Sequence, residues 1–303
     1  MQSHDPHEPV TSVPDYAAAL RLVEPTAESS NPSMSTPENE ATHINFDAIA
    51  TGIISTLNDS SSVDRATAVE NARKQYGEGT TNPFAEKFAR VLIDARSWDQ
   101  KHSQLQILKS ERNAEARVQG KKNLPMSPEE KALKYEVITL NHDLRELFEA
   151  KGNGFTTAEL TQWYGNVLGE KMQTAAREIS GVVAEVTLRK ILSQADFLEA
   201  VQYGDIYEDA KGRDIVGLIK APTDTERITL TADSKAGGQD TEVDVDDKLG
   251  VKIVMGVDLG RLDAYGNIDD VYTQELIFKA GLALQKAVVL RTLKIAERQA
   301  QSI

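Results

Sequence analysis

The spacing of apolar residues changes near residue 195, and this change constrains the fold more than any other feature. Between residues 44 and 194, apolar side chains recur every three or four positions, which predicts amphipathic helices. From residue 200 to 259 they mostly alternate with polar ones, as in half-buried strands. Helical spacing returns over 271–299. We therefore expect an α/β protein, α+β overall, in which helices precede a strand-rich block and a helix closes the chain.

Short sequence motifs predict where the helices and strands begin and end. A helix is expected after Pro83, and the capping sequence Ser127–Glu130 opens another. Thr156–Glu159 opens a third, which we expect to reach residue 194 with a break near Gly165 and Gly169. The acidic stretch 240–246 is interpreted as a solvated turn. The predicted strands cover 200–209, 213–221, 227–236 and 251–259.

Composition marks residues 1–44 as a separate part of the chain. They hold six of the ten prolines, and seven acids against one arginine, which is typical of a disordered acidic tail. The apolar stretch Tyr16–Val23 is compatible with a short docking helix inside it. We expect 45–170 to form a helical region and 171–303 to form the strand-containing domain.

Residue usage excludes several kinds of chemistry. The 303-residue chain has no cysteine, so disulfides, thiol nucleophiles and thiolate-bound zinc are excluded. Its five histidines end at His142, so a site in the C-terminal half needs carboxylates, lysine, hydroxyls or a metal unless the N-terminal part folds back. The net charge of -13 argues against nonspecific coating of nucleic acid. Without signal-peptide features or a membrane-spanning run, we expect a cytoplasmic protein.

The strongest local pattern is a hairpin that carries acidic residues. Pro222–Thr225 is a turn sequence, and a turn centred on it pairs residues whose numbers sum to 447. Asp214 then lies opposite Asp233, with Cβ atoms about 5 Å apart. Two carboxylates at this spacing repel each other and favour a shared hard cation. Lys235 shares the face of Asp233 because side chains alternate along a strand.

A third acid, Glu185, borders the apolar stripe of the preceding helix. Glu on a helix, Asp at a strand start and Asp-x-Lys on the hairpin partner resemble the PD-(D/E)XK nuclease superfamily. The matching segments are Gly181–Glu185, Gly212–Val216 and Thr231–Lys235. The resemblance covers roughly residues 175–300. It implies a restriction-endonuclease-like mixed sheet flanked by helices, so that 171–303 is a PD-(D/E)XK-like nuclease domain.

This resemblance implies hydrolysis of phosphodiester bonds that depends on Mg²⁺ or Mn²⁺, with DNA as the expected substrate. Asp214 and Asp233 would hold the metal, and the backbone carbonyl of Ser234 would be a further ligand. Lys235 would orient the attacking water or help to deprotonate it, and Glu185 would bind a second metal or its water. The physical basis is a Lewis acid on the phosphate and a lowered water pKa.

Several patterns compete with this interpretation. Acid-x-Lys occurs six times, and only the copy at Asp233 ends an alternating strand with an acid opposite. Asp246–Lys248 is a rival motif, for which Asp233 would be the first acid. Arg213 stands where the family has proline, and position 233 is Asp where Glu is commoner. A solvated hairpin with surface ion pairs would use the same residues.

Basic residues gather in two places where phosphates could bind, although each is more often a solvated face. The segment 101–122 has six basic and two acidic residues. The final helix carries Lys279, Lys286, Arg291, Lys294 and Arg298. An alternative function is a non-catalytic, nuclease-like or helical protein that binds or assembles within a larger complex. A protein partner for the helical region and a homo-oligomer are compatible with both functions.

Overall fold

The computed structural model describes residues 44–301, except for 59–64, 78–81, 212, 221–227, 238–240 and 247–248. Glu40–Ile303 form one compact unit. Within the described ranges, no helix has the length and apolar character needed to cross a membrane. The expected tail, up to residue 43, and the expected turn at Pro222–Thr225 lie outside the described residues.

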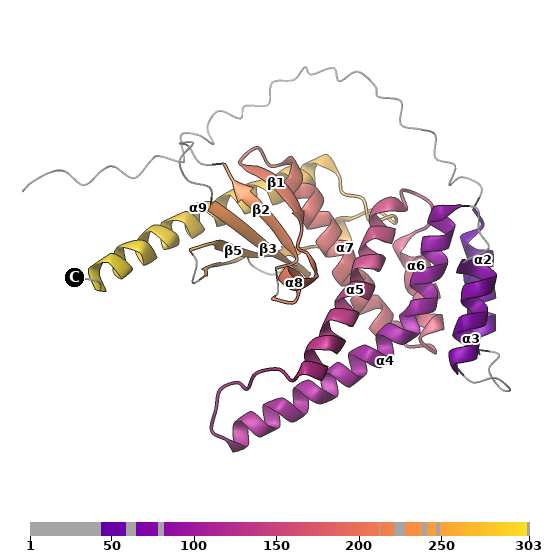
Figure 1. The fold of residues 1–303 in the computed structure, drawn as a ribbon. Coiled ribbons are helices and arrows are strands. Elements are labelled where there is room, and N and C mark those ends of the chain that lie inside the picture. Colours follow the sequence, from indigo (N-terminus) through magenta and orange to yellow (C-terminus); the bar gives the residue numbers. More distant parts are fainter. Residues whose placement is uncertain are drawn as a thin grey trace, which may run out of the picture. The chain divides into compact units, whose positions relative to one another are not determined.

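Helices make up the described chain up to residue 194 (Figure 1). Asn82 caps one of them by accepting hydrogen bonds from the backbone amides of the first turn, Ser127 caps the next, and Thr156 forms a reciprocal capping box with Glu159. All three predicted starts are confirmed. In order, the helices are α2 (Phe46–Asn58), α3 (Arg65–Ala72), the π-helical turn η2 (Arg73–Gly77), α4 (Pro83–Val118), α5 (Pro128–Ala150), α6 (Thr157–Val167) and α7 (Met172–Gln194).

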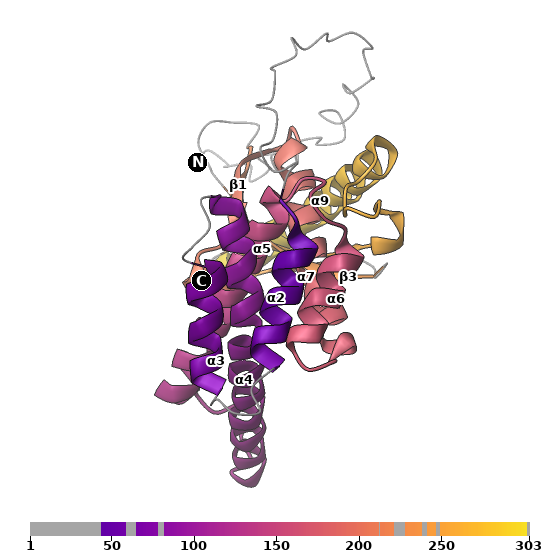
Figure 2. The ribbon, with the colours of Figure 1, turned by 90° about the vertical axis from the view of Figure 1, so that its right-hand side faces the viewer.

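An aromatic core holds these helices together, and they lie side by side in Figure 2. Phe46 of α2 contacts Phe88 of α4 and Phe155 edge-on, with ring centroids 5.0 and 5.2 Å apart. Edge-on pairs of this kind add to the stability that comes from burial alone. Helix α7 packs into this core through its first half and against the sheet through its second half. It therefore joins the two parts of the compact unit.

The sheet has five strands in the order β1-β2-β3-β5-β4. All neighbours are antiparallel except β3 and β5, which are parallel. Parallel neighbours are usually joined by a helix, whereas here the chain passes through the edge strand β4 and then inserts β5. The mixed sheet with helices around it agrees with the expected α+β fold. The strands are β1 (Leu198–Tyr203), β2 (Ile215–Ile219), β3 (Ile228–Ala236), β4 (Glu242–Val245) and β5 (Val251–Val257).

The two faces of the sheet differ in character, as the alternation predicted. One face is apolar and packs against α7 and against the last helix, α9 (Asp270–Gln301) (Figure 1). Ile228, Leu230 and Ala232 of β3 point into this core. The other face carries half-buried side chains such as Val216 and Val254. Asp233 and Lys235 belong to this second face because they alternate with the buried residues of β3.

Two predictions about the strand block were wrong. The strand expected over 200–209 ends at Tyr203, because Asp205 caps a short helix, α8 (Ile206–Asp209), by accepting from the amides of Tyr207 and Glu208. The acidic stretch interpreted as a solvated turn contains β4, which pairs with β5. The two acids within β4, Glu242 and Asp244, are exposed on this edge strand, where charged side chains are tolerated because water reaches them.

A close backbone approach at Gly204 positions the first acid of the hairpin. The Gly204 amide donates to the carbonyl of Asp214 over 2.8 Å. A Cβ atom at Gly204 would lie 2.1 Å from the Arg213 carbonyl oxygen. Only glycine permits this approach, so the connection after β1 can hold the segment that enters β2.

We expect Gly204→Ala to destabilise the protein by about 2 kcal/mol, because the backbone of Arg213 must move to avoid the new methyl group. The measurement is chemical denaturation followed by circular dichroism. Gly181→Ala is the matched control: its Cβ meets nothing within 4 Å, and alanine favours the helix by about 0.5–1 kcal/mol. A loss of stability for Gly181→Ala equal to that for Gly204→Ala would contradict this account.

Candidate metal centre

The register of the hairpin confirms the predicted pairing of its two acids. Ile215 of β2 pairs with Ala232 of β3, so the next pair outward is Asp214 with Asp233. A hydrogen bond joins their side chains. Opposed residues in neighbouring strands extend to the same side, so the two carboxyl groups meet at the end of the sheet where β2 begins.

This pair has lost most of its contact with water. Burial, the hydrogen bond with Asp233, and the negative charges of Glu185, Asp233 and Asp209 raise the pKa of Asp214 to about 9. Asp214 therefore keeps its proton at neutral pH and donates it to Asp233, because two adjacent carboxylates cannot both ionise without compensation. A divalent cation shared by both groups would provide the same neutralisation.

Glu185 approaches the pair from α7 and is held by an arginine that the sequence did not indicate. The Nη2 atom of Arg145, on α5, lies 2.7 Å from Oε1 of Glu185, and only 4% of the arginine side chain is exposed. Burial raises the pKa of Glu185 to about 8; the charge of Arg145 opposes this rise, and Asp209 and Asp233 add to it. The residue expected to bind a second metal is thus already paired with a cation.

Asp209 is a fourth acid in the cluster, and sequence reasoning missed its role. Its Oδ2 lies 3.0 Å from Nη2 of Arg145 and 2.9 Å from Nε2 of His142. Burial acts to raise the pKa of Asp209, but the hydrogen bond with His142 and the charge and hydrogen bond of Arg145 hold it below its usual range. The N-terminal helices therefore fold back and supply a histidine to the C-terminal half.

The ring of Tyr203 also holds Arg145 in place. Its guanidinium lies 4.5 Å from the ring centroid of Tyr203, whose hydroxyl donates to Glu149 over 2.6 Å. Even so, Nε and Nη1 of Arg145 are buried without a hydrogen-bond partner in the described part of the chain. Buried polar groups without partners are costly. The cluster therefore has unused capacity for a polar ligand.

Lys235 completes the predicted set. Its Nζ lies 3.2 Å from Oδ2 of Asp233, and about half of its side chain is exposed (51%). The pair resembles a surface ion pair in strength, typically below ~1 kcal/mol, so it leaves the ammonium free to reorient. Ser234, whose backbone carbonyl is the third predicted ligand, lies between these two residues in β3.

The oxygen donors fit a hard divalent cation. Asp214, Asp233 and the Ser234 carbonyl are all oxygen ligands, which Mg²⁺ and Mn²⁺ prefer. Within the described ranges, no group of three or more His, Asp or Glu side chains is already arranged to hold a metal ion. Glu185 would join the set only by leaving Arg145. The residues present thus fit one cation at the aspartate pair better than two.

The rival motif at Asp246 is placed differently. Strand β5 lies between β3 and β4, so Asp246, directly after β4, does not face Asp233 across a strand pair. Its Oδ1 accepts from the Gly250 amide over 2.9 Å, and its Oδ2 lies 3.3 Å from Arg213. Arg213, in the position of the family's proline, also pairs with Glu208 over 2.8 Å. Asp247 and Lys248 lie outside the described residues.

The basic residues of the last helix do not form one surface. Lys279 pairs with Glu275 over 2.9 Å. Arg291 and Lys294 donate to the backbone carbonyls of Leu249 and Val245, over 2.9 and 2.7 Å. Their donors are thus used to hold α9 against the sheet. Lys286 and Arg298, the other two residues of the predicted set, have exposed side chains.

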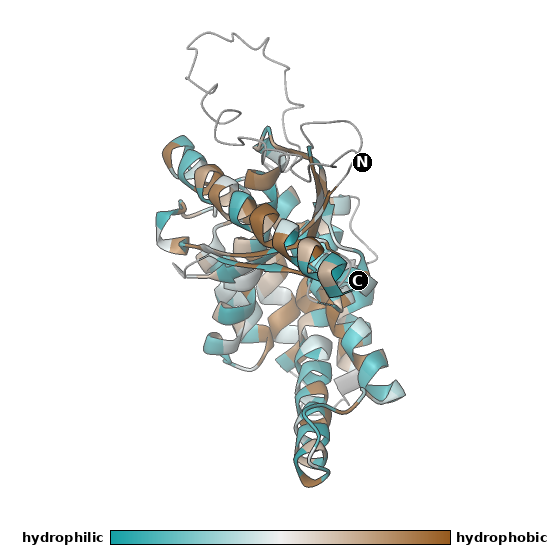
Figure 3. Cartoon of the chain, turned by 90° about the vertical axis from the view of Figure 1, so that its left-hand side faces the viewer, coloured by the Kyte–Doolittle hydropathy of each residue, from teal (hydrophilic) through white to brown (hydrophobic). Residues whose placement is uncertain are grey.

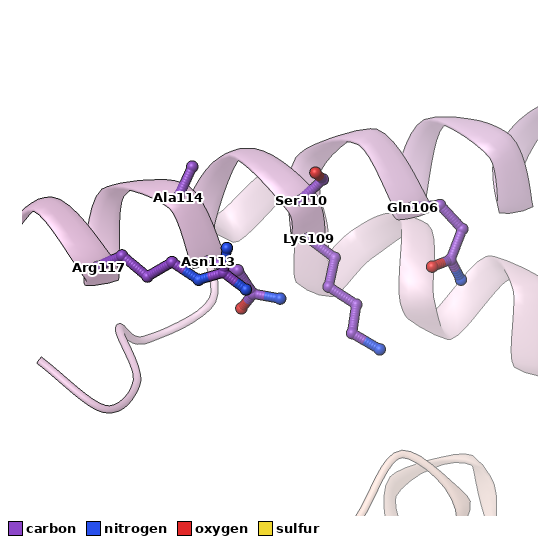
Figure 4. A pocket seen from close by; sticks show the side chains of 6 residues that line it. All are labelled: Gln106, Lys109, Ser110, Asn113, Ala114 and Arg117. Carbon is purple, nitrogen blue, oxygen red and sulfur yellow. The ribbon is translucent and has the colours of Figure 1, made fainter.

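The second basic segment, on helix α4, is more exposed to solvent. Six exposed residues of this helix line a hollow of about 280 Å³, and in Figure 4 Lys109 and Arg117 extend to the same side of the helix. Lys101 and Arg112, by contrast, pair with Glu136 and Glu130 of α5. The hollow is lined by Gln106, Lys109, Ser110, Asn113, Ala114 and Arg117.

Comparisons with known proteins give no family for the chain: no family model, no curated protein and no solved structure matches it. The function is therefore inferred from the geometry of the cluster.

Asp214→Asn should stabilise the metal-free protein, by on the order of 2 kcal/mol at pH 8. The folded state keeps the Asp214 proton up to about pH 9, whereas an unfolded aspartate loses it near pH 4. Rising pH therefore favours the unfolded chain between these values, and asparagine removes this effect. The measurement is thermal unfolding from pH 5 to pH 9 in a chelating buffer, with a stabilisation that grows with pH.

The matched control is Asp196→Asn, at an exposed aspartate outside the cluster. It should show no gain that grows with pH. An Asp214→Asn protein whose stability follows that of the wild type at every pH would contradict the buried, protonated pair.

Arg145→Met should cost about 3–5 kcal/mol, because it leaves the Asp209 carboxylate buried without its guanidinium and leaves Glu185 without its hydrogen-bond partner. Arg90→Met is the control, since the pair of Arg90 with Asp143 is longer, at 3.4 Å, and more exposed. Chemical denaturation at pH 7 measures both. Equal losses for the two variants would show that Arg145 has no special role.

Proposed function

We propose that this chain is a metal-dependent nuclease that hydrolyses phosphodiester bonds in DNA, with residues 171–303 as a PD-(D/E)XK-like domain. The buried carboxyl pair carries the proposal. Asp214 and Asp233 share one proton at the end of a hairpin, and the Lys235 ammonium lies 3.2 Å from Asp233. An arrangement that costs stability in the absence of a ligand is typical of a functional site.

Each residue of the cluster would have a separate role. When bound, Mg²⁺ or Mn²⁺ would supply Lewis acidity and lower the pKa of a water molecule. Asp214 and Asp233 would hold the cation with the Ser234 carbonyl, after Asp214 has lost its proton. Lys235 would orient the attacking water and offset charge on the phosphate. Glu185, fixed by Arg145, would hydrogen-bond to water at the rim of the site.

The DNA backbone would contact exposed cations, because phosphate neutralisation dominates affinity. Lys109 and Arg117 on α4 support such a contact, since both are exposed and extend to the same side (Figure 4). Lys286 on α9 is also exposed. Arg291 and Lys294 support it less, because they donate to backbone carbonyls within the protein.

A second candidate is a non-catalytic binding or assembly protein with a nuclease-like sheet. The observation that favours it is the ion pair of Glu185 with Arg145, because a cation already placed in the cluster can neutralise part of its charge. In this case Asp214 and Asp233 would remain a protonated pair, and metal would leave the melting temperature unchanged.

The proposal predicts DNA cleavage by the purified protein with Mg²⁺ or Mn²⁺ and none with a chelator. Asp233→Ala, Asp214→Asn and Lys235→Ala should each reduce the rate on the order of a hundredfold or more, since each removes a ligand or the positive charge at the phosphate. Gel assays on supercoiled, linear and single-stranded DNA measure this.

Glu242→Gln, on the exposed edge strand, serves as the control and should keep full activity. Intact DNA with the wild-type protein, on all substrates and with both metals, would overturn the catalytic proposal. A melting temperature that is also insensitive to metal would then favour the non-catalytic candidate.

A further inference from the structure

The last helix exposes an apolar stripe on the side that faces away from the sheet. Five large side chains along it have exposed fractions between 48% and 73%. Their spacing is seven, four, seven and four residues, which keeps them within a narrow band of the helix surface. They are Val271, Phe278, Leu282, Val289 and Leu293.

This stripe is distinct from the face by which α9 packs on the sheet. The residues that α9 buries end at Ala287, while the exposed stripe continues for six more residues to Leu293. Apolar segments recur along the whole α9 ribbon in Figure 3. The helix is thus apolar on two sides, and a helix that is apolar on more than one side usually has more than one partner.

The stripe is not suited to a nucleic acid. Lys279, at its border, is paired with Glu275, and Arg291 and Lys294 are turned toward the carbonyls of Leu249 and Val245. Lys286, also at the border, is exposed, but a single lysine neutralises few phosphates. An apolar centre with few charges is typical of the core of a protein–protein contact.

We infer that the stripe binds the same stripe of a second copy of this chain, with the two α9 helices antiparallel. The last four residues of the stripe, from Phe278 to Leu293, are placed symmetrically about a point between Gln285 and Lys286. A two-fold axis at this point sets Phe278 against Leu293 of the second copy, and Leu282 against Val289. This is the self-complementarity that a two-fold interface requires.

The area available agrees with a dimer. From the exposed fractions, the five side chains offer roughly 500 Å² in each copy, and roughly 1,000 Å² in a pair, which is about the minimum for a specific interface. The chain's own apolar stretch Tyr16–Val23 is too short to cover the stripe. Eight helical residues span roughly 12 Å, whereas the stripe spans roughly 33 Å.

Sedimentation velocity of the full chain, from low micromolar to several hundred micromolar, tests this inference independently of any nuclease activity. The wild type should pass from monomer to dimer, and Leu282→Glu should raise the dissociation constant about thirtyfold or more. Ile107→Glu is the control, because Ile107 is at least as exposed (58% against 48% for Leu282) but lies on α4. A wild type that is monomeric throughout, or a dimer that Leu282→Glu leaves intact, would overturn the inference.

Thiol cross-linking tests the antiparallel orientation of the two α9 helices. Because the chain has no cysteine of its own, only the introduced thiols can form a disulfide. A mixture of Phe278→Cys and Leu293→Cys proteins should form a disulfide-linked dimer, because these positions face each other. Phe278→Cys alone should not, since its two thiols would be roughly 22 Å apart. A linked dimer of Phe278→Cys alone would contradict the antiparallel arrangement.

Discussion

The candidate site depends on how its buried carboxyl groups are neutralised away from water. Four acids, Glu185, Asp209, Asp214 and Asp233, meet where α5, α7, α8 and the hairpin converge, and Arg145 is the one buried cation among the described residues that pairs with two of them. One buried arginine cannot balance four carboxylates, so some of them take protons or share them. The raised pKa values of Asp214 and Glu185 express this deficit.

The same constraint links the helical region to the sheet. Arg145 and His142 lie on α5, one helical turn apart, and their partners lie on α7 and α8. Because α7 is buried in both hydrophobic cores, Glu185 has little freedom to move when a ligand arrives. A cation at the aspartate pair would therefore bind beside a fixed Glu185, and it would have to displace the proton of Asp214.

The hairpin could be predicted from the sequence because its register depends on one turn and on alternation along two strands. Asp214 and Asp233 follow from that symmetry. Arg145 and Asp209 could not be predicted, because they are 64 residues apart and periodicity does not say which helix face meets which loop. Strand β4 was missed since two of its four residues are acidic, and an exposed edge strand needs only one apolar side. The basic residues of α9 do not form the single face that was expected, because lysine and arginine side chains can reach backbone carbonyls as well as phosphate.

We propose that the carboxyl pair binds one divalent cation. Isothermal titration of the metal-free protein with Mg²⁺ and Mn²⁺, in two buffers of different ionisation enthalpy at pH 7.5, tests it directly. We expect one cation per chain, with release of about one proton, which Asp214 holds at this pH. Binding should be lost in Asp214→Asn and kept in Asp196→Asn. No binding of either metal, or binding with no proton released and unchanged by Asp214→Asn, would contradict the claim.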